Sequence, residues 1–216
     1  MNVTIALLTY NRRELFQSTL ESLAQTEHPY KLVIYDNGSK DGTADIVRSL
    51  GGVVNDTDNH TVGHGMNKAI GLALETNPDL VVFTADDYTY QAGWLERLVS
   101  FWQDAPADII LSCNCVESLW QWNEVTGFGE AGGVRYVTRA SIPGSNWTFR
   151  AETAKRFMPL PEKTGGEDLE VCRMFTEQGY RLAELNLSEH TGEKQSAWGN
   201  TSWERATPFD FERYGI

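Results

Sequence analysis

Two adjacent carboxylates, Asp86 and Asp87, follow directly after a largely apolar run at positions 80–85 of this 216-residue chain. A short apolar run that ends in polar residues is typical of a strand buried on both faces of a parallel sheet. Open α/β sheets bind ligands at the carboxyl ends of their strands, and paired carboxylates there suit a divalent cation that holds a phosphate group. A polar corner with a helix cap is the alternative interpretation of the pair.

The carboxylates belong to a repeating order of strand and helix patterns in the first half of the chain. Strands that alternate with helices of about ten residues predict right-handed βαβ crossovers and a mostly parallel sheet. We therefore expect an α/β fold whose first half is a nucleotide-binding half-domain. The predicted strands cover residues 3–8, 31–35, 52–55 and 80–85, and the predicted helices begin near residues 13, 44, 66 and 95.

The second half of the chain differs from the first in composition and in hydrophobic pattern. Residues 118–139 include two tryptophans and four glycines, and a segment of this length without periodicity is typical of a binding loop or lid. Further elements are predicted as a strand at 109–113, a strand end and helix at 149–158, a helix from Glu167 to 179, and a strand at 181–187. The C-terminal tail, residues 196–216, is aromatic and has no clear periodicity.

Composition limits the class of protein. The length fits one larger α/β domain with a substantial core. The formal net charge of -12 argues against a general affinity for nucleic acid or anionic membranes, since both attract basic surfaces. Cys113, Cys115 and Cys172 have neither disulfide nor zinc spacing, which indicates buried thiols in a reducing compartment. No signal peptide and no apolar run of about 20 residues is present, so we expect a soluble, cytoplasmic protein without a membrane span.

Five short motifs stand in the order found in a known family. The first three are Thr9-Tyr10-Asn11-Arg12, the D-N-G-S-K-D-G-T loop at 36–43, and G-M-N-K-A at 65–69. The others are the strand and G-W-L helix start at 83–95, and G-E-D at 166–168 with Arg173 and Gly179-Tyr180. Over roughly residues 3–190 the chain resembles the inverting glycosyltransferases of family 2.

The resemblance implies a single GT-A domain over residues 1–216. Its Rossmann-like, mostly parallel central sheet is flanked by helices. Residues of about 1–100 would form the half that binds the nucleotide sugar, and residues of about 101–195 a smaller acceptor-side half.

The resemblance places the donor nucleotide at the carboxyl ends of the first strands. Asp36 would accept a hydrogen bond from uracil N3–H, which favours a UDP-linked sugar, and a turn role is the alternative. Tyr10 would stack on the base, and Arg12 would reach a phosphate. Gly63 and Gly65 resemble a phosphate loop, or else provide flexibility. The residues assigned to the nucleotide sugar are Thr9, Tyr10, Asn11, Arg12, Asp36, Asn37, Gly65, Asn67, Thr84, Ala85 and Asp86.

A divalent cation, Mn²⁺ or Mg²⁺, is expected to hold the donor diphosphate and to stabilise the charge that builds on the leaving group. The implied ligands are Asp86, Asp87 and His190; imidazole suits Mn²⁺, and a plain surface role is the alternative for the histidine. The family pattern at the strand end is D-x-D. Thr84 replaces its first aspartate here, and Asp87 is the residue that would compensate.

Asp168, with Glu167 beside it, is the implied catalytic residue. An inverting transfer is a single displacement that needs a base for the proton of the acceptor hydroxyl, and a carboxylate at a helix amino end can take it. Helix capping favoured by the dipole is the alternative. Trp147 and the pair Trp120 and Trp122 would stack on sugar faces or belong to the core.

The expected function is metal-dependent, inverting transfer of one sugar from a nucleoside-diphosphate sugar to an acceptor hydroxyl. The acceptor is open among a glycan, a lipid-linked sugar, a protein and a modified nucleic-acid base. Thr84 keeps an alternative open, a catalytically silent protein that binds a carbohydrate or nucleotide sugar. A dehydrogenase is disfavoured because T-Y-N-R, not G-x-G-x-x-G, follows the first strand. A processive polysaccharide synthase is disfavoured because the chain has no Q-x-x-R-W sequence.

Overall fold

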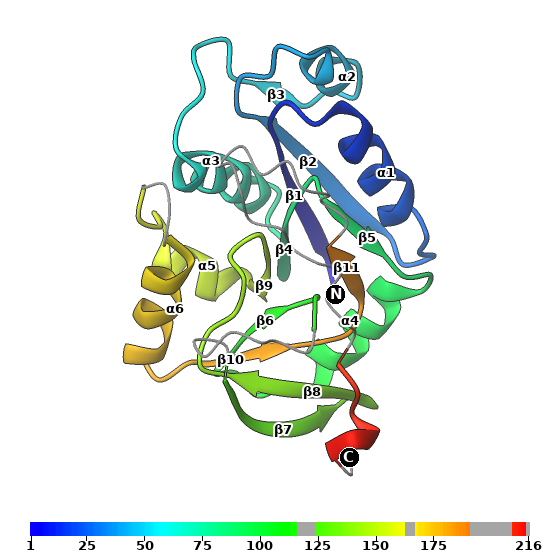
Figure 1. The fold of residues 1–216 in the computed structure, drawn as a ribbon, viewed down its shortest axis with the longest axis vertical. Helices are drawn as coiled ribbons and strands as arrows, with labels where there is room; N and C mark the ends of the chain where they lie inside the picture. Colours follow the sequence, from blue (N-terminus) through cyan, green and yellow to red (C-terminus); the bar gives the residue numbers. More distant parts are fainter. Residues whose placement is uncertain (116–123, 163–166, 191–208, 215–216) are drawn as a thin grey trace.

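A nine-stranded sheet forms the centre of the computed structural model, which describes residues 1–115, 124–162, 167–190 and 209–214. Its strand order is β3-β2-β1-β4-β9-β6-β10-β8-β7 (Figure 1). The parallel strands of the first half are β1 (Val3–Thr9), β2 (Tyr30–Asp36), β3 (Val53–Val54) and β4 (Leu80–Ala85). The helices between them are α1 (Arg13–Leu23), α2 (Thr43–Ser49) and α3 (Val62–Glu75). The predicted α/β fold is confirmed.

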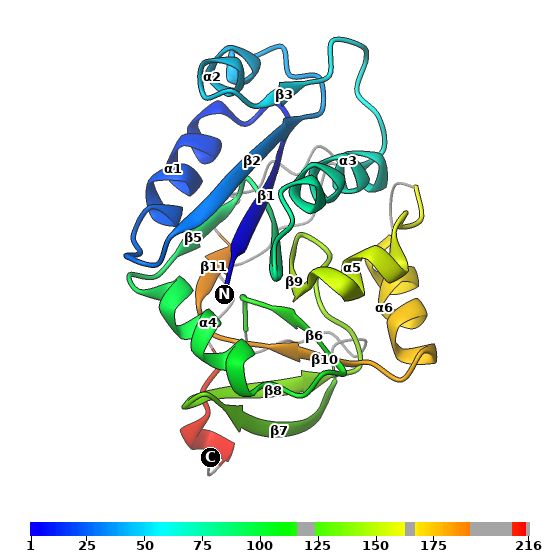
Figure 2. The ribbon, with the colours of Figure 1, turned by 180° about the vertical axis from the view of Figure 1, so that it is seen from behind.

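Burial on both faces explains why these apolar segments are strands. All seven residues of β1 are buried, and successive side chains belong alternately to two core clusters, Leu7 to one and Leu8 to the other. Helices α1 and α4 (Trp94–Asp104) cover the first face of the sheet, and α3, α5 (Ala151–Phe157) and α6 (Glu167–Glu177) cover the second (Figure 2). Burial of this kind is characteristic of parallel strands.

The second half continues the same sheet. Strand β9 (Asn146–Arg150) runs antiparallel between β4 and β6 (Ile109–Ser112). Beyond β6 lies β10 (Arg181–Glu184), which is parallel to β6 and antiparallel to β8 (Val134–Arg139). The ladder between β4 and β9 therefore joins the second half of the chain directly to β4, the strand at the end of the first-half order β3-β2-β1-β4.

The prediction of a loop or lid at residues 118–139 is wrong for the residues of this segment that the structure describes. Residues 124–139 are described, and β7 (Val125–Ala131) and β8 form an antiparallel hairpin there. Glycine in β7 reflects cross-strand packing, because a Cβ at Gly129 would lie 2.3 Å from the Tyr136 ring opposite it. Trp120 and Trp122 lie outside the described residues.

A second, two-stranded sheet was not predicted. Strand β5 (Tyr88–Tyr90) pairs antiparallel with β11 (Ser188–His190), and His190 stands in register with Tyr88. This pairing brings the end of the second half against the residues that directly follow the two carboxylates.

Trp147 and Phe209 belong to the interior. Trp147 is fully buried and packs edge-on against Phe175 of α6, so sugar stacking by this ring is wrong. Phe209 is buried beside Cys115 and Val137, ahead of the short 3-10 helix Glu212–Tyr214. None of the helices in the described ranges combines the length and apolar character that a bilayer span requires.

Candidate functional site

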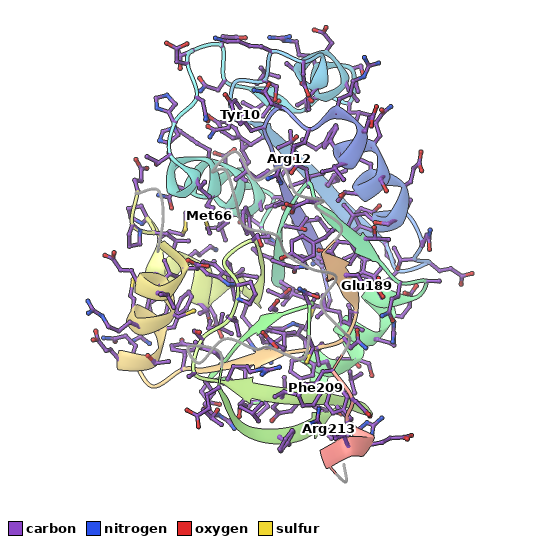
Figure 3. All side chains as sticks on the ribbon, in the orientation of Figure 1. Tyr10, Arg12, Met66, Glu189, Phe209 and Arg213 are labelled. Atoms are coloured by element: carbon purple, nitrogen blue, oxygen red, sulfur yellow. The ribbon has the colours of Figure 1, made fainter. Side chains whose placement is uncertain are left out.

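Asp86 is held at the carboxyl end of β4 by Thr9, the last residue of β1, and by residues that follow it. The Thr9 hydroxyl donates to Asp86 Oδ2 at 2.6 Å, and the Tyr10 backbone N–H donates to the same oxygen at 3.3 Å. The side chain of Arg12 donates from Nη1 to Asp86 Oδ1 at 3.2 Å. Figure 3 shows Tyr10 and Arg12 at this end of β1. Parallel pairing of β1 with β4 produces the arrangement, since Leu8 stands beside Ala85.

The same Arg12 nitrogen also donates to Asp87 Oδ2, so one guanidinium bridges two buried carboxylates. Burial and then the charge of Asp87 raise the pKa of Asp86 to about 6, against the opposing effect of Arg12. Burial lowers the pKa of Arg12, but the charges of Asp87 and Asp86 outweigh it and the net pKa is raised. The site is therefore a pocket of negative charge that a cation stabilises.

The donor set fits a divalent metal. Asp86 and Asp87 supply hard oxygen atoms, which Mn²⁺ and Mg²⁺ prefer, and the Arg12 guanidinium is a cation already held by both. Within the described ranges, no group of three or more His, Cys, Asp or Glu side chains is arranged so that it could hold a metal ion. The third ligand predicted from the sequence is His190, whose backbone pairs with Tyr88, the residue after Asp87. Its side chain lies outside the described part of the structure.

Asp36 presents a carboxylate oxygen that the described protein does not satisfy. Its Oδ1 accepts from the backbone N–H groups of Gly38 at 2.8 Å and Ser39 at 2.7 Å. Its Oδ2 is buried and has no hydrogen-bond partner among the described residues. The residue ends β2 in register with Thr9. A buried acceptor without a donor is costly, so the atom is suited to a ligand N–H.

Two of the three asparagines in the predicted nucleotide site, Asn11 and Asn37, connect loops. Asn11, at φ 51°, donates its backbone N–H to the Ser39 hydroxyl, and its side-chain oxygen accepts from the N–H of Lys40. Asn37 donates from Nδ2 to Asn59 Oδ1 at 2.8 Å and to the His60 carbonyl at 3.0 Å. These contacts order the loop after β2, and contact with a nucleotide remains a prediction for both.

Gly65 and Asn67 have packing tasks in α3. A Cβ at Gly65 would stand 2.7 Å from Leu8 Cδ1, so glycine lets the helix approach β1 closely. Asn67 exchanges two hydrogen bonds with the backbone of Leu160, at 2.9 Å and 2.8 Å. Gly63 likewise lies against the chain, since its Cβ would be 2.3 Å from the Pro161 carbonyl oxygen. Close packing thus accounts for both glycines of the G-H-G sequence.

Thr84 faces inward. Its side chain is fully buried, and its hydroxyl donates to the Ala85 carbonyl at 3.0 Å. The Ala85 N–H in turn donates to the carbonyl of Ser145 at 2.8 Å. The carboxylates at the open end of β4 are thus those of Asp86 and Asp87, and the predicted roles of Thr84 and Ala85 in donor binding remain predictions.

Ser145 and Tyr88 were not among the predicted site residues. Their hydroxyl groups form a hydrogen bond of 2.7 Å, and Tyr88 directly follows Asp87 in the chain. Burial and then Asp87 raise the pKa of Tyr88, with smaller contributions from Glu184 and Asp168. The hydroxyl pair therefore lies within electrostatic reach of both Asp87 and Asp168. The G-S-N sequence at the start of β9 was the available signal for a turn with a hydroxyl group. Nothing in the local sequence indicates that this hydroxyl contacts Tyr88 of β5.

Asp168 lies in the first turn of α6 and is half-buried. A Cβ on Gly144 would be 2.8 Å from Asp168 Cβ, so α6 packs directly against the turn that precedes β9. Ser145 is the next residue in that turn, so Asp168 lies against the residue that precedes the Tyr88 contact. Glu167 opens the helix, and its side chain lies outside the described part.

Comparison with known proteins identifies the family. Residues 4–155 match the family model described as glycosyl transferase family 2. The chain belongs to this family. An O-antigen chain rhamnosyltransferase of Salmonella typhimurium is 28% identical over 107 residues, 48% of this chain and 34% of the relative. A glucosyl-dolichyl phosphate glucuronosyltransferase of Haloferax volcanii is 33% identical over 112 residues, 49% of this chain and 36% of the relative. The aligned part thus spans about a third of each relative.

Solved structures confirm the GT-A fold of this family member. The mannosyltransferase PcManGT of Pyrobaculum calidifontis, in complex with GDP-Man and Mn²⁺, superposes with a TM-score of 0.62 at 21% identity, over 84% of this chain and 53% of that one. Residues 1–349 of TarS from S. aureus superpose with a TM-score of 0.63 at 18% identity, over 86% of this chain and 58% of that one.

Proposed function

We propose that this protein is a metal-dependent, inverting glycosyltransferase that moves one sugar from a UDP-linked donor to an acceptor hydroxyl. The observation that carries the proposal is the buried Asp36 Oδ2, which has no hydrogen-bond partner in the described part of the chain and lies at the same sheet edge as Asp86 and Asp87. The membership of family 2 supports glycosyl transfer. The complexes of PcManGT with GDP-Man and Mn²⁺, and of TarS with UDP, support a nucleoside-diphosphate sugar and a divalent metal.

The residues divide the reaction between them. Asp86 and Asp87, with His190, would hold the cation, which when bound supplies Lewis-acid stabilisation of the departing diphosphate. Asp168 takes the proton of the acceptor hydroxyl while the acceptor oxygen bonds to the anomeric carbon. The bond from that carbon to the diphosphate oxygen breaks on the opposite face, which inverts the configuration. The hydrogen bond between Ser145 and Tyr88 links the turn that packs on α6 to β5, the strand that directly follows the two carboxylates.

The base preference is the sharpest test of the donor assignment. Asp36 Oδ1 is fixed by two backbone N–H donors, so Asp36→Asn should keep its oxygen there and place an NH₂ group at the Oδ2 position. Uracil presents an N3–H donor, whereas cytosine presents an N3 acceptor at the same ring position. The variant should therefore bind UDP at least about tenfold more weakly than wild type does, and bind CDP more tightly, because a buried donor facing another donor is penalised.

The measurement is calorimetric titration of UDP, CDP and GDP with Mn²⁺ into wild type and Asp36→Asn, with Asn55→Asp as a charge-altered control in a neighbouring loop. Unchanged UDP affinity in the Asp36 variant would exclude the base contact. Tightest binding of GDP by wild type would replace uridine with guanosine, whose N1–H also needs an acceptor. A protein that binds UDP but never transfers or hydrolyses a donor would support a silent binding function.

A further inference from the structure

We propose that Arg12 is a built-in counter-ion for the carboxylate pair Asp86 and Asp87. The Arg12 guanidinium must release both acids before a metal can bind, and as a result the metal and the donor diphosphate bind cooperatively. The inference rests on the proposed function, because it assumes that Asp86 and Asp87 hold the metal. It adds an exchange of cations at that site. The guanidinium occupies the carboxylates in the metal-free protein and moves to the diphosphate when the donor arrives.

The contacts define the exchange. A single nitrogen, Arg12 Nη1, donates to Asp86 Oδ1 at 3.2 Å and also to Asp87 Oδ2. The two acids are buried, with 3% and 8% of their side chains exposed. A metal that took these two oxygens would replace the Arg12 nitrogen, because two cations cannot share them without strong repulsion at short range.

The Arg12 side chain is freer to move than the side chains of Asp86 and Asp87. Its side chain is 26% exposed, and the residue precedes α1 in a non-helical backbone conformation, with φ -143° and ψ 50°. Asp86, by contrast, is fixed from the other side by the Thr9 hydroxyl and the Tyr10 N–H. A cation entering the pair therefore displaces the arginine and leaves the carboxylates in place.

The displaced guanidinium needs an anion, and a diphosphate is a strong partner for it. A metal that binds alone must break the Arg12 contacts without compensation. A metal that binds with a diphosphate leaves Arg12 paired again. Because binding linkage is reciprocal, the diphosphate then raises the affinity for the metal by the same factor by which the metal raises the affinity for the diphosphate.

Removal of the guanidinium tests this coupling. Arg12→Met keeps much of the length of the side chain without its charge, and Arg13→Met is the matched control, because Arg13 is exposed and its guanidinium lies beside Gly42. Mn²⁺ is titrated at pH 8, with and without saturating UDP, and free Mn²⁺ is followed by electron paramagnetic resonance. We expect Arg12→Met to bind Mn²⁺ alone about tenfold more tightly than wild type does. We also expect UDP to enhance its Mn²⁺ affinity at least tenfold less than in wild type, and Arg13→Met to match wild type.

A measurement on the wild-type protein guards against a variant that fails to fold. Modification of Arg12 by phenylglyoxal, followed by mass spectrometry, should rise at least threefold when Mn²⁺ is added alone and fall again when UDP is also present. Equal or weaker Mn²⁺ binding by Arg12→Met would overturn the exchange and leave metal dependence standing, as would modification of Arg12 that Mn²⁺ does not change. Absence of Mn²⁺ binding in all three proteins, with or without UDP, would overturn both the exchange and the metal site of the proposed function.

Discussion

At the scale of single residues, the site depends on charges that the fold keeps buried. Asp86 tolerates burial because a hydroxyl, a backbone N–H and a guanidinium all donate to it. Each donor comes from the four residues that begin at Thr9, so one short stretch at the end of β1 organises the carboxylate at the end of β4. Buried ionised groups are stable only with such partners.

At this scale, the prediction for the transfer step concerns the predicted general base, Asp168. Asp168→Asn retains the size of the side chain but cannot accept a proton, so transfer should fall by about 10² to 10⁴. Donor binding and melting temperature should hardly change, because asparagine serves a helix start about as well as aspartate. Slow hydrolysis of UDP-sugar by water provides the assay until an acceptor is identified.

The control for Asp168 is Glu177→Gln, which neutralises an exposed acid on the last turn of the same helix. It should leave hydrolysis unchanged. A normally stable Asp168→Asn protein whose rate stays within about threefold of wild type would remove Asp168 from the chemistry, since general bases contribute far more than that.

At the scale of elements, the β7–β8 hairpin shows how glycine content misled the sequence interpretation. Its turn docks on α4 through Gly132, whose carbonyl accepts from the Ser100 hydroxyl at 2.8 Å. Gly132 has φ +54°, and a Cβ there would lie 2.0 Å from the Ser100 carbonyl oxygen. Gly133 has φ +72°, and a Cβ there would meet nothing within 4 Å. The glycines of this segment therefore serve close packing and a left-handed turn.

These neighbouring glycines give a matched pair of substitutions. Gly133→Ala should cost about 1 kcal/mol for the left-handed backbone alone. Gly132→Ala should cost that amount plus about 1 to 3 kcal/mol for the clash with α4. Urea denaturation of both variants measures the difference. Equal losses of unfolding free energy would mean that the turn does not pack on α4 in solution.

Local patterns predicted those elements that bury apolar side chains along a continuous stretch, as in β4, where Leu80 to Phe83 are all buried. They also predicted that Asp36 and Asp86 lie at one edge, because parallel strands share one carboxyl edge. Strand β5 was missed because its partner β11 lies about a hundred residues away in the chain. The Arg12 bridge was missed for a related reason, since a flexible side chain selects its partner only in the folded protein.

At the scale of the whole molecule, strand β10 illustrates how the second half is held. It begins at Arg181, whose guanidinium makes a bidentate pair with Asp108 at 2.8 and 2.9 Å on the surface. It ends at Glu184, which accepts from Arg139 Nε of β8 at 2.9 Å in the interior. The exposed fractions are 47% and 46% for the first pair and 3% and 0% for the second. One strand thus carries an exposed and a buried version of the same interaction.

The two pairs should respond very differently to loss of the acid. Asp108→Asn should cost less than about 1 kcal/mol, because water solvates the exposed Arg181 charge. Glu184→Gln should cost about 3 kcal/mol or more, because the buried Arg139 charge loses the carboxylate that neutralises it. Replacing both buried partners, as Arg139→Met with Glu184→Leu, should recover part of that loss, since no buried charge of the pair then remains.

Chemical denaturation of wild type, the two single variants and the double variant at pH 7 measures these differences in unfolding free energy. The contrast is informative because both acids accept a hydrogen bond from an arginine Nε at nearly the same distance, while only the Glu184 pair is buried. If Glu184→Gln proves as mild as Asp108→Asn, water must reach the Arg139 side chain, and the packing of β8 against β10 would have to be looser than the structure shows. If the double substitution destabilises further than Glu184→Gln, the pair contributes specific hydrogen bonding that apolar side chains cannot replace.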